Sequence, residues 1–234
     1  MDKTLRDAAR EYLVRYGGDT FPNLFTSAKG TVVRDDTGRE ILDFTSGQMC
    51  ATIGHNHPDI VAAVHRAGET AFHFFSGMIP ETVARLAATV ARDWMPAGLT
   101  KSIFVNTGSE SNEIALRMAK MHKNGFEILA IGGSWHGVTS GAGSVSYASD
   151  RKGYGVPPAG VFVMPEPNAY RPYIAGLDPE QSALACLEIG LKMFDMASAG
   201  RPAAIIVEPV ISAGGVLVPP KSYMQALRQA ETHA

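Results

Sequence analysis

The chain has 234 residues, of which 45% are hydrophobic, and its 21 basic and 23 acidic residues give a formal net charge of −2. The apolar content suffices for a sizeable core, and the charges form no blocks, so we expect neither a nucleic-acid-binding surface nor a basic membrane patch. Residues 1–10 are polar, unlike a signal peptide, and no apolar run is long enough to span a bilayer. These features predict a cytoplasmic protein whose partners are small molecules and copies of itself, with no nucleic-acid or membrane partner. Cys50 and Cys186 are expected to be buried thiols.

The amino-terminal region has the pattern of an arm followed by a small ribbon. Apolar residues of the segment 5–16 recur at helical spacing and end at a glycine pair. Two short runs, 31–33 and 41–44, flank the turn-forming segment 35–38 (DDTG), which is typical of a two-stranded antiparallel ribbon. We therefore assign residues 1–57 to an arm and ribbon of a small domain.

From residue 58 the pattern changes to helices alternating with short apolar strands. We predict strands at 103–105, 126–131, 161–164 and 203–207, and helices at 58–71, 81–94, 109–122, 179–198 and 221–233. This alternation predicts an α/β fold with a mainly parallel sheet covered on both faces. The last helix reaches Ala234 with no glycine stop and no closing strand. We therefore expect residues 58–234 to be an incomplete large domain, truncated at the carboxyl terminus.

The strongest single motif is the segment 106–113 (NTGSESNE), between a predicted strand and a predicted helix. Gly108 lets the backbone approach a ligand closely, and the amides of Gly108 and Ser109 meet the positive end of the helix dipole together with the Ser109 hydroxyl. This arrangement suits a phosphate. The segment fits equally well an ordinary capped helix, with Ser109 as the cap and Glu110 and Glu113 in its first turn. Neither the dinucleotide-binding Gly-x-Gly-x-x-Gly pattern after a strand nor a Gly-Lys-Ser/Thr sequence occurs in the chain.

A glycine-rich turn, 132–137 (GGSWHG), follows the next predicted strand. Its indole, Trp135, is the stacking partner that a planar heteroaromatic cofactor needs. Its imidazole, His136, fits a cofactor ligand and a structural hydrogen-bonding residue equally well. The turn therefore favours a bound planar cofactor over a plain capped helix.

Three segments together, 106–113, 134–137 (SWHG) and Glu208-Pro209, resemble the class III aminotransferases, which are pyridoxal-phosphate enzymes of fold type I. The resemblance covers nearly the whole chain. It implies the mainly parallel sheet of that fold's large domain, an amino-terminal arm, and association into homodimers or homotetramers. It also implies that pyridoxal 5'-phosphate is bound by Thr107, Gly108, Ser109, Asn112, Trp135 and His136, with Trp135 stacked on the ring.

Within this family, some segments are similar to 2,2-dialkylglycine decarboxylases in particular: 43–49 (DFTSGQM), 75–78 (FSGM) and 151–153 (RKG). This likeness implies that Gln48 faces the substrate carboxylate that leaves as carbon dioxide, with Met49 beside it. It implies that Ser76 gives oxygen ligands to an alkali cation, K⁺ or Na⁺. Glu208 stands where the family keeps a glutamate that can pair with a pocket arginine. Ala213 stands where those decarboxylases have a serine whose hydroxyl lines the substrate pocket. The identity of the preferred substrate is therefore not decided by the resemblance.

The resemblance also implies a lysine that holds the cofactor and a carboxylate against its pyridine nitrogen. Neither occurs in a matching context, so we expect both beyond Ala234 and expect the isolated chain to be inactive. Three hypotheses stay open. The first is a decarboxylating transaminase that releases carbon dioxide from a dialkylglycine and passes the amino group to pyruvate. The second is a plain class III aminotransferase for other amino acids or ω-amines, and the third is a non-catalytic fragment that only associates.

Overall fold

The computed structural model describes residues 4–14, 20–70, 73–148 and 155–230, and the chain divides into two compact units, Met1–Thr100 and Lys101–Ala234. We call these unit 1 and unit 2. The division groups residues by proximity, and the domain boundary proposed after residue 57 stays a prediction.

Unit 1 begins with a helix and a three-stranded antiparallel ribbon. The strands, in the order β1-β2-β3, are β1 (Phe25–Lys29), β2 (Val32–Asp35) and β3 (Glu40–Leu42). The predicted pairing of β2 with β3 is confirmed, and β1 adds a strand that the polar sequence FTSAK did not indicate. Helix α1 (Leu5–Tyr12) starts at a capping box made by Thr4 and Asp7 and ends earlier than predicted. Arg6 of α1 forms a forked pair with Asp36 beside β2, which ties the helix to the ribbon.

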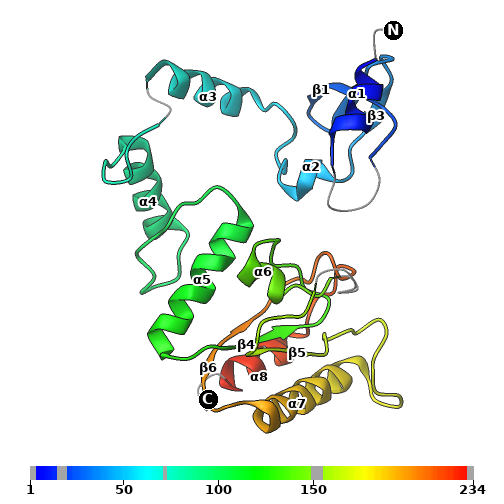
Figure 1. Cartoon of the computed structure of the whole chain (residues 1–234), viewed down its shortest axis with the longest axis vertical. Helices are drawn as coiled ribbons and strands as arrows, with labels where there is room; N and C mark the ends of the chain where they lie inside the picture. Colours follow the sequence, from blue (N-terminus) through cyan, green and yellow to red (C-terminus); the bar gives the residue numbers. More distant parts are fainter. Residues whose placement is uncertain (1–3, 15–19, 71–72, 149–154, 231–234) are drawn as a thin grey trace. The chain divides into compact units, whose positions relative to one another are not determined.

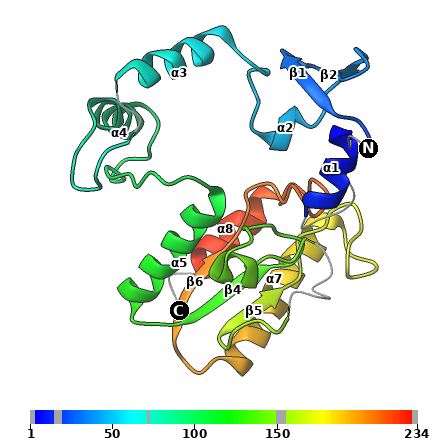
Figure 2. The ribbon, with the colours of Figure 1, turned by 45° about the horizontal axis from the view of Figure 1, so that its top comes forward.

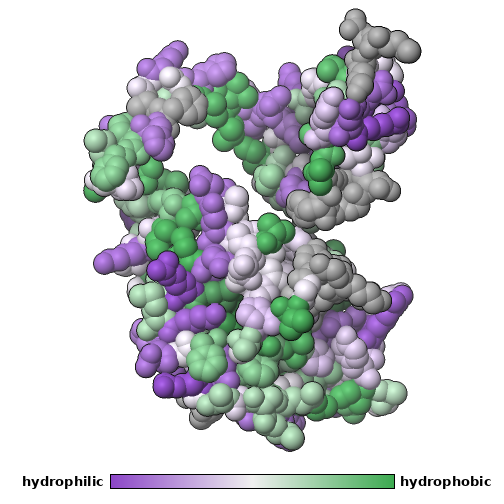
Figure 3. Space-filling view, in the orientation of Figure 1, coloured by the Kyte–Doolittle hydropathy of each residue, from purple (hydrophilic) through white to green (hydrophobic). Residues whose placement is uncertain are grey.

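The rest of unit 1 is a short turn and two helices. The turn α2 (Ser46–Met49) has non-helical backbone angles inside it, whereas α3 (Pro58–Thr70) and α4 (Glu81–Asp93) are regular and confirm the helices predicted there. Hydrophobic side chains lie at the surface of α3 and α4 among hydrophilic ones, as Figure 3 shows; Ile60 of α3 is 55% exposed.

Unit 2 is built on a parallel sheet, as predicted. Its strands, in the order β5-β4-β6, are β4 (Glu127–Ile131), β5 (Val161–Met164) and β6 (Pro202–Ile206). The strand predicted at 103–105 is wrong, since these residues form no strand and Ile103 is 61% exposed. An apolar run becomes a strand only where a neighbouring strand offers hydrogen bonds and a covered face, and the described part of unit 2 offers neither here.

Helices cover both faces of this sheet (Figure 1 and Figure 2). They are α5 (Gly108–Lys123), the short α6 (Ser140–Ser144), α7 (Pro179–Ala197) and α8 (Lys221–Ala230). Because side chains alternate along a strand, Ile128 and Ala130 of β4 pack on one face with Leu116 of α5. Leu129 and Ile131 pack on the other face with residues of α7 and α8. The two-period alternation of one central strand therefore divides the core between two helical layers.

All hydrophobic side chains that are buried in the described residues belong to unit 2. In the described part of unit 1 the buried side chain is a carboxylate, Asp35. Cys186 of α7 is buried as expected, but Cys50 is exposed, because the segment that carries it has no apolar layer over it. Among the described helices, none combines the length and apolar character needed to cross a bilayer.

Candidate functional site

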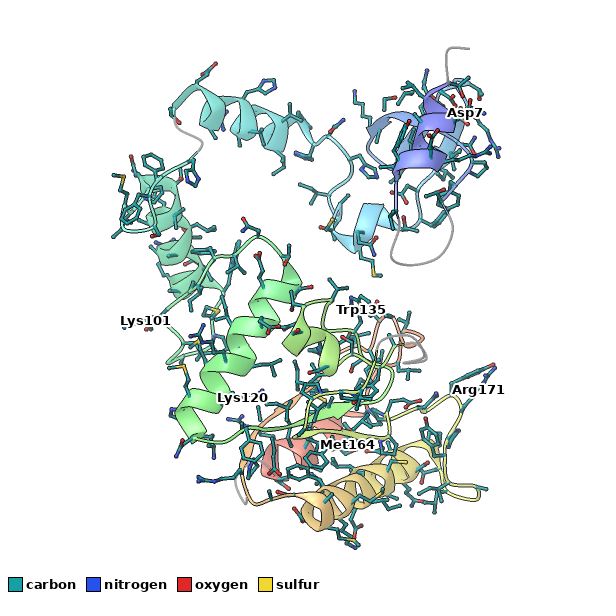
Figure 4. The ribbon with its side chains drawn as sticks, viewed as in Figure 1. Asp7, Lys101, Lys120, Trp135, Met164 and Arg171 are labelled. Carbon is teal, nitrogen blue, oxygen red and sulfur yellow. The ribbon has the colours of Figure 1, made fainter. Side chains whose placement is uncertain are left out.

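The candidate site lies at the carboxyl ends of the three parallel strands of unit 2, where ligands of α/β proteins usually bind. The turn 132–137 follows β4, and the segment 207–214 follows β6. The amino end of α5 joins this edge through two contacts to the segment after β4. The Asn112 side-chain amide donates to the His136 carbonyl at 2.7 Å, and the Val138 amide donates to Ser109 Oγ at 3.1 Å. Figure 4 shows Trp135 beside α6 and Met164 between the sheet and α7.

The amino end of α5 is capped by Thr107 and not, as the capped-helix alternative had it, by Ser109. The Thr107 hydroxyl accepts from the Glu110 amide at 3.1 Å, and the Glu110 carboxylate accepts from the Thr107 amide at 3.1 Å. The amides of Gly108 and Ser109 lie in the first turn of α5, where N–H groups have no carbonyl acceptor within the helix. They can therefore donate to a ligand. A Cβ built on Gly108 would meet nothing within 4 Å, so this helix end is open. The Ser109 oxygen accepts from Val138, which leaves its own proton to donate elsewhere.

Glycine brings the turn 132–137 against α5. Gly137 has φ 133°, and a Cβ there would lie 2.8 Å from Ser109 Cα, so a side chain at this position would push the turn away from the helix. The His136 amide donates to Ser146 Oγ at 2.8 Å, which fixes the turn on its other side. Trp135 is half-buried in this arrangement.

Glu208 connects the segment after β6 with the Trp135 turn. Its Oε1 accepts from the Trp135 amide at 2.5 Å and its Oε2 from the Ser212 amide at 3.2 Å. A Cβ on Gly214 would lie 2.9 Å from Gly133 Cα, so the two segments also touch through backbone. Glu208 therefore holds the backbone of the predicted stacking residue with one oxygen and orders the segment after β6 with the other.

One ring nitrogen of His136 makes no hydrogen bond to the described residues. The side chain is 5% exposed, and its Nε2 has no hydrogen-bond partner in the described part of the chain. Burial lowers the pKa of His136 below its ordinary value, while the charge of Glu208 opposes this shift. The imidazole is therefore neutral at pH 7. Its buried Nε2 lacks the hydrogen-bond partner that buried polar atoms normally have.

Glu113 is a residue of the site that sequence reasoning did not identify beyond its place in the first turns of α5. Its carboxylate accepts from the Thr139 hydroxyl at 2.7 Å and from the amides of Gly141 and Ala142 at 3.0 Å, so it fixes the start of α6. The Thr139 hydroxyl is the main cause that holds the pKa of Glu113 below its usual value. The small polar run around Thr139 was the available signal for this helix start.

The predicted site residues fall into both units. Unit 2 gathers Thr107, Gly108, Ser109, Asn112, Trp135, His136 and Glu208, with Ala213 exposed next to Ser212. Gln48 and Met49 are exposed in α2 of unit 1, and Ser76 is exposed in the turn between α3 and α4. The segment 151–153 lies outside the described residues.

Known proteins that resemble the chain agree on one family. The sequence model of the family described as Aminotransferase class-III matches residues 14–232. A Schizosaccharomyces pombe protein named "Uncharacterized aminotransferase C1039.07c" is 41% identical over 97% of this chain and 50% of its own length. An acetylornithine aminotransferase of Methanosarcina acetivorans is 28% identical over 97% of this chain and 51% of its own length. The chain thus spans about half the length of the curated relatives it matches.

Solved structures agree with this result. The taurine:2-oxoglutarate aminotransferase of Bifidobacterium kashiwanohense, in complex with pyridoxal phosphate and glutamate, superimposes with a TM-score of 0.88 and 26% identity over 100% of this chain and 54% of that one. The fold is that of the fold-type-I pyridoxal-phosphate transaminases. The chain belongs to the class-III aminotransferase family.

Proposed function

We propose that the complete gene product is a pyridoxal-phosphate-dependent aminotransferase whose cofactor binds at the carboxyl edge of the sheet in unit 2. One observation carries the proposal: the open amino end of α5 and the Trp135 turn are hydrogen-bonded into one site. The amides of Gly108 and Ser109 and the Ser109 hydroxyl suit the cofactor phosphate. The Trp135 indole suits the face of its ring, and the buried Nε2 of His136 is a polar atom that the cofactor can satisfy.

The roles of the surrounding residues follow from their contacts. Bound pyridoxal phosphate supplies an electron sink for the bond that breaks in the substrate. Glu208 and Asn112 hold the backbone on either side of the Trp135 side chain, so the indole is positioned before the cofactor arrives. Thr107 keeps the amino end of α5 in place through its cap.

We further propose the finer reaction, carbon dioxide loss from a dialkylglycine with transfer of the amino group to pyruvate. In this reaction the Gln48 amide donates to the departing carboxylate, Met49 lines the same pocket, and Ser76 supplies oxygen to K⁺ or Na⁺. The support is the likeness of the segments 43–49 and 75–78 to dialkylglycine decarboxylases, and the exposure of Gln48 in a non-helical turn. A homodimer or homotetramer and a cytoplasmic location are part of the same proposal.

Plain amino transfer is the second candidate. Two observations favour it: some relatives are named acetylornithine aminotransferase and omega-aminotransferase, and Ala213 lacks the hydroxyl that the decarboxylases have. In that case Glu208 and Ala213 are substrate-pocket residues for other amino acids or ω-amines.

The cofactor site is tested by titrating the complete gene product with pyridoxal phosphate. Trp135→Ala should raise the dissociation constant roughly 2- to 13-fold, since an aromatic contact contributes about 0.5–1.5 kcal/mol beyond its area. Trp135→Phe is the matched control and should retain most of the affinity. Unchanged affinity in Trp135→Ala would mean that this residue serves packing alone. A complete gene product that binds no cofactor at all would leave a non-catalytic role in association as the remaining hypothesis.

The reaction type is tested with 2-methylalanine and L-alanine as alternative amino donors. The parent should release carbon dioxide from the first and transfer the amino group of the second. Gln48→Ala should slow carbon dioxide release about tenfold more than amino transfer, because the lost amide contacts only the departing carboxylate in that geometry. A parent that transfers amino groups but releases no carbon dioxide would decide for the plain aminotransferase.

A further inference from the structure

The segment 43–55 of unit 1 is a loop whose two ends are hydrogen-bonded to the same turn between β1 and β2. The Asp43 amide donates to the Thr31 carbonyl at 2.8 Å. The His55 amide donates to the Gly30 carbonyl at 2.8 Å, and the Gly30 amide donates to the His55 carbonyl at 2.9 Å. These bonds bring Asp43 and His55 side by side at the base of the loop.

The two side chains close this base and reach into the loop. His55 Nε2 donates to Asp43 Oδ2 at 2.7 Å. The same carboxylate accepts from the Thr45 amide at 2.8 Å, from the Thr45 hydroxyl at 2.6 Å and from the Gly47 amide at 2.7 Å. The Thr45 hydroxyl first, and then His55, hold the pKa of Asp43 well below its usual range, so the carboxylate stays charged.

The loop needs this support because its tip has an unfavourable backbone. Ser46 has φ 52° and Met49 has φ 60°, both in the left-handed region that side chains disfavour, and Gly47 between them has φ 65°. The α2 turn has no side-chain cap of its own. The His55 ring lies beside it, since a Cβ on Gly47 would be 3.6 Å from His55 Cε1. The Asp43 carboxylate therefore stabilises the backbone conformation of the turn that carries Gln48.

We infer that Asp43 and His55 are positioning residues, which fix the turn 46–49 and so present the Gln48 amide to the carboxylate of an amino-acid substrate. This inference rests on the proposed function, and in particular on a substrate contact by Gln48. In this role His55 acts through Asp43, and Asp43 acts through the Thr45 amide and hydroxyl and the Gly47 amide, so neither touches the substrate.

The geometric part is tested in the 234-residue chain by amide hydrogen exchange, read by NMR. In Asp43→Asn and His55→Phe, the Thr45 and Gly47 amides should exchange at least about tenfold faster than in the parent. The His55 backbone bonds to Gly30 survive the phenylalanine substitution, so the effect reports the lost side-chain donor. His55→Gln keeps an amide donor at a similar distance and should restore most of the protection. His65→Phe, at an exposed histidine of α3, is the matched control, and the Gly38 amide in the ribbon is the internal reference.

The functional part is tested in the complete gene product with pyridoxal phosphate bound. His55→Phe should slow carbon dioxide release from 2-methylalanine up to about tenfold more than amino transfer from L-alanine, as Gln48→Ala does, and His55→Gln should reverse most of this difference. Adding His55→Phe to Gln48→Ala should then change the ratio of the two rates by less than about twofold, because the residue through which His55 acts is already gone.

The two arms separate the possible failures. Equal exchange rates in parent and His55→Phe would overturn the positioning role, and so would an undiminished effect of His55→Phe on the ratio of the two rates in the Gln48→Ala background. A complete gene product that transfers no amino groups would overturn the proposed function, and the exchange rates would still decide whether the pair holds the turn.

Discussion

The two units of the chain are stabilised by different forces. Unit 2 contains a parallel sheet whose faces bury two hydrophobic clusters, with Leu129 and Ile131 on one side and Ile128 and Ala130 on the other. The described part of unit 1 buries no hydrophobic side chain, and its buried residue is Asp35. We infer that packing stabilises unit 2, whereas hydrogen bonds to charged acceptors keep the ribbon and loop of unit 1 in shape.

Both units nevertheless use carboxylates in the same local way. Asp43 in unit 1 and Glu113 and Glu208 in unit 2 each accept backbone amides of a loop that carries predicted site residues or a neighbour of them. Such charge-assisted bonds fix a backbone more strongly than neutral ones. In unit 2 these bonds refine a loop that grows from a packed sheet, whereas in unit 1 they take the place of packing.

A substitution in the core of unit 2 should have the largest effect. Leu129→Ala removes a side chain that is 2% exposed between the sheet and α7, and should lower the free energy of unfolding by about 2–5 kcal/mol. The measurement is urea unfolding followed by Trp135 fluorescence in a Trp94→Phe background. Leu42→Ala, at a leucine of β3 that is 60% exposed, is the matched control and should change this free energy by less than about 0.5 kcal/mol. Equal losses in both variants would contradict the contrast between the units.

Acid should have an intermediate effect on the ribbon of unit 1. Bonds from the Thr37 hydroxyl first, and then from the Arg39 amide and Asn23, outweigh the burial of Asp35 and lower its pKa to about 2. A carboxylate whose folded pKa is lowered contributes stability that is full above its unfolded pKa near 3.9 and is lost as the pH falls through the folded value. The ribbon should therefore weaken between about pH 4 and about pH 2.

NMR signals of the Thr37 and Arg39 amides, followed in urea at about pH 6 and about pH 2.5, measure this loss. In Asp35→Asn the ribbon should unfold at a lower urea concentration than in the parent at the higher pH. That urea concentration should change little further at the lower pH. Asp36→Asn, at the neighbouring carboxylate, should keep the parent's loss on acidification. A parent ribbon that is equally stable at both pH values would show that Asp35 does not hold it.

The sequence predicted those parts of the fold that local patterns decide. The apolar runs of β4, β5 and β6 were recognisable because buried parallel strands are short and β-branched, and the helices between them showed their own periodicity. The helix-start motif at 106–113 and the glycine-rich motif at 132–137 were also visible, because glycine and a helix start have local signatures.

The remainder depended on contacts between distant residues. Glu208 meets Trp135 across 73 positions and Glu113 meets Ala142 across 29, so no local pattern indicates these pairs. The apolar segment 103–105 was assigned to a strand because its composition fits one, yet strand formation needs a partner that composition does not reveal. No local pattern paired Asp43 with His55 either, because the two ends of their loop meet only through Gly30 and Thr31.

The smallest effect is expected from removing a polar atom in the core of unit 2. Tyr223 of α8 is fully buried, and its hydroxyl has no hydrogen-bond partner in the described residues. Burial is the main cause that raises the pKa of this phenol, so it stays protonated, with a polar group in apolar surroundings. Tyr223→Phe removes that group and keeps the ring, so the free energy of unfolding should rise or stay within about 0.5 kcal/mol of the parent.

The same fluorescence-detected urea unfolding measures the change, with Tyr223→Ala as the control for the ring. The alanine variant should lose about 3–5 kcal/mol, because it leaves a cavity beside Leu227 and Ile211. A phenylalanine variant that is less stable by more than about 1.5 kcal/mol would mean that the hydroxyl has a partner. Polar bonds would then contribute to the core of unit 2 as well, and the contrast with unit 1 would be one of degree.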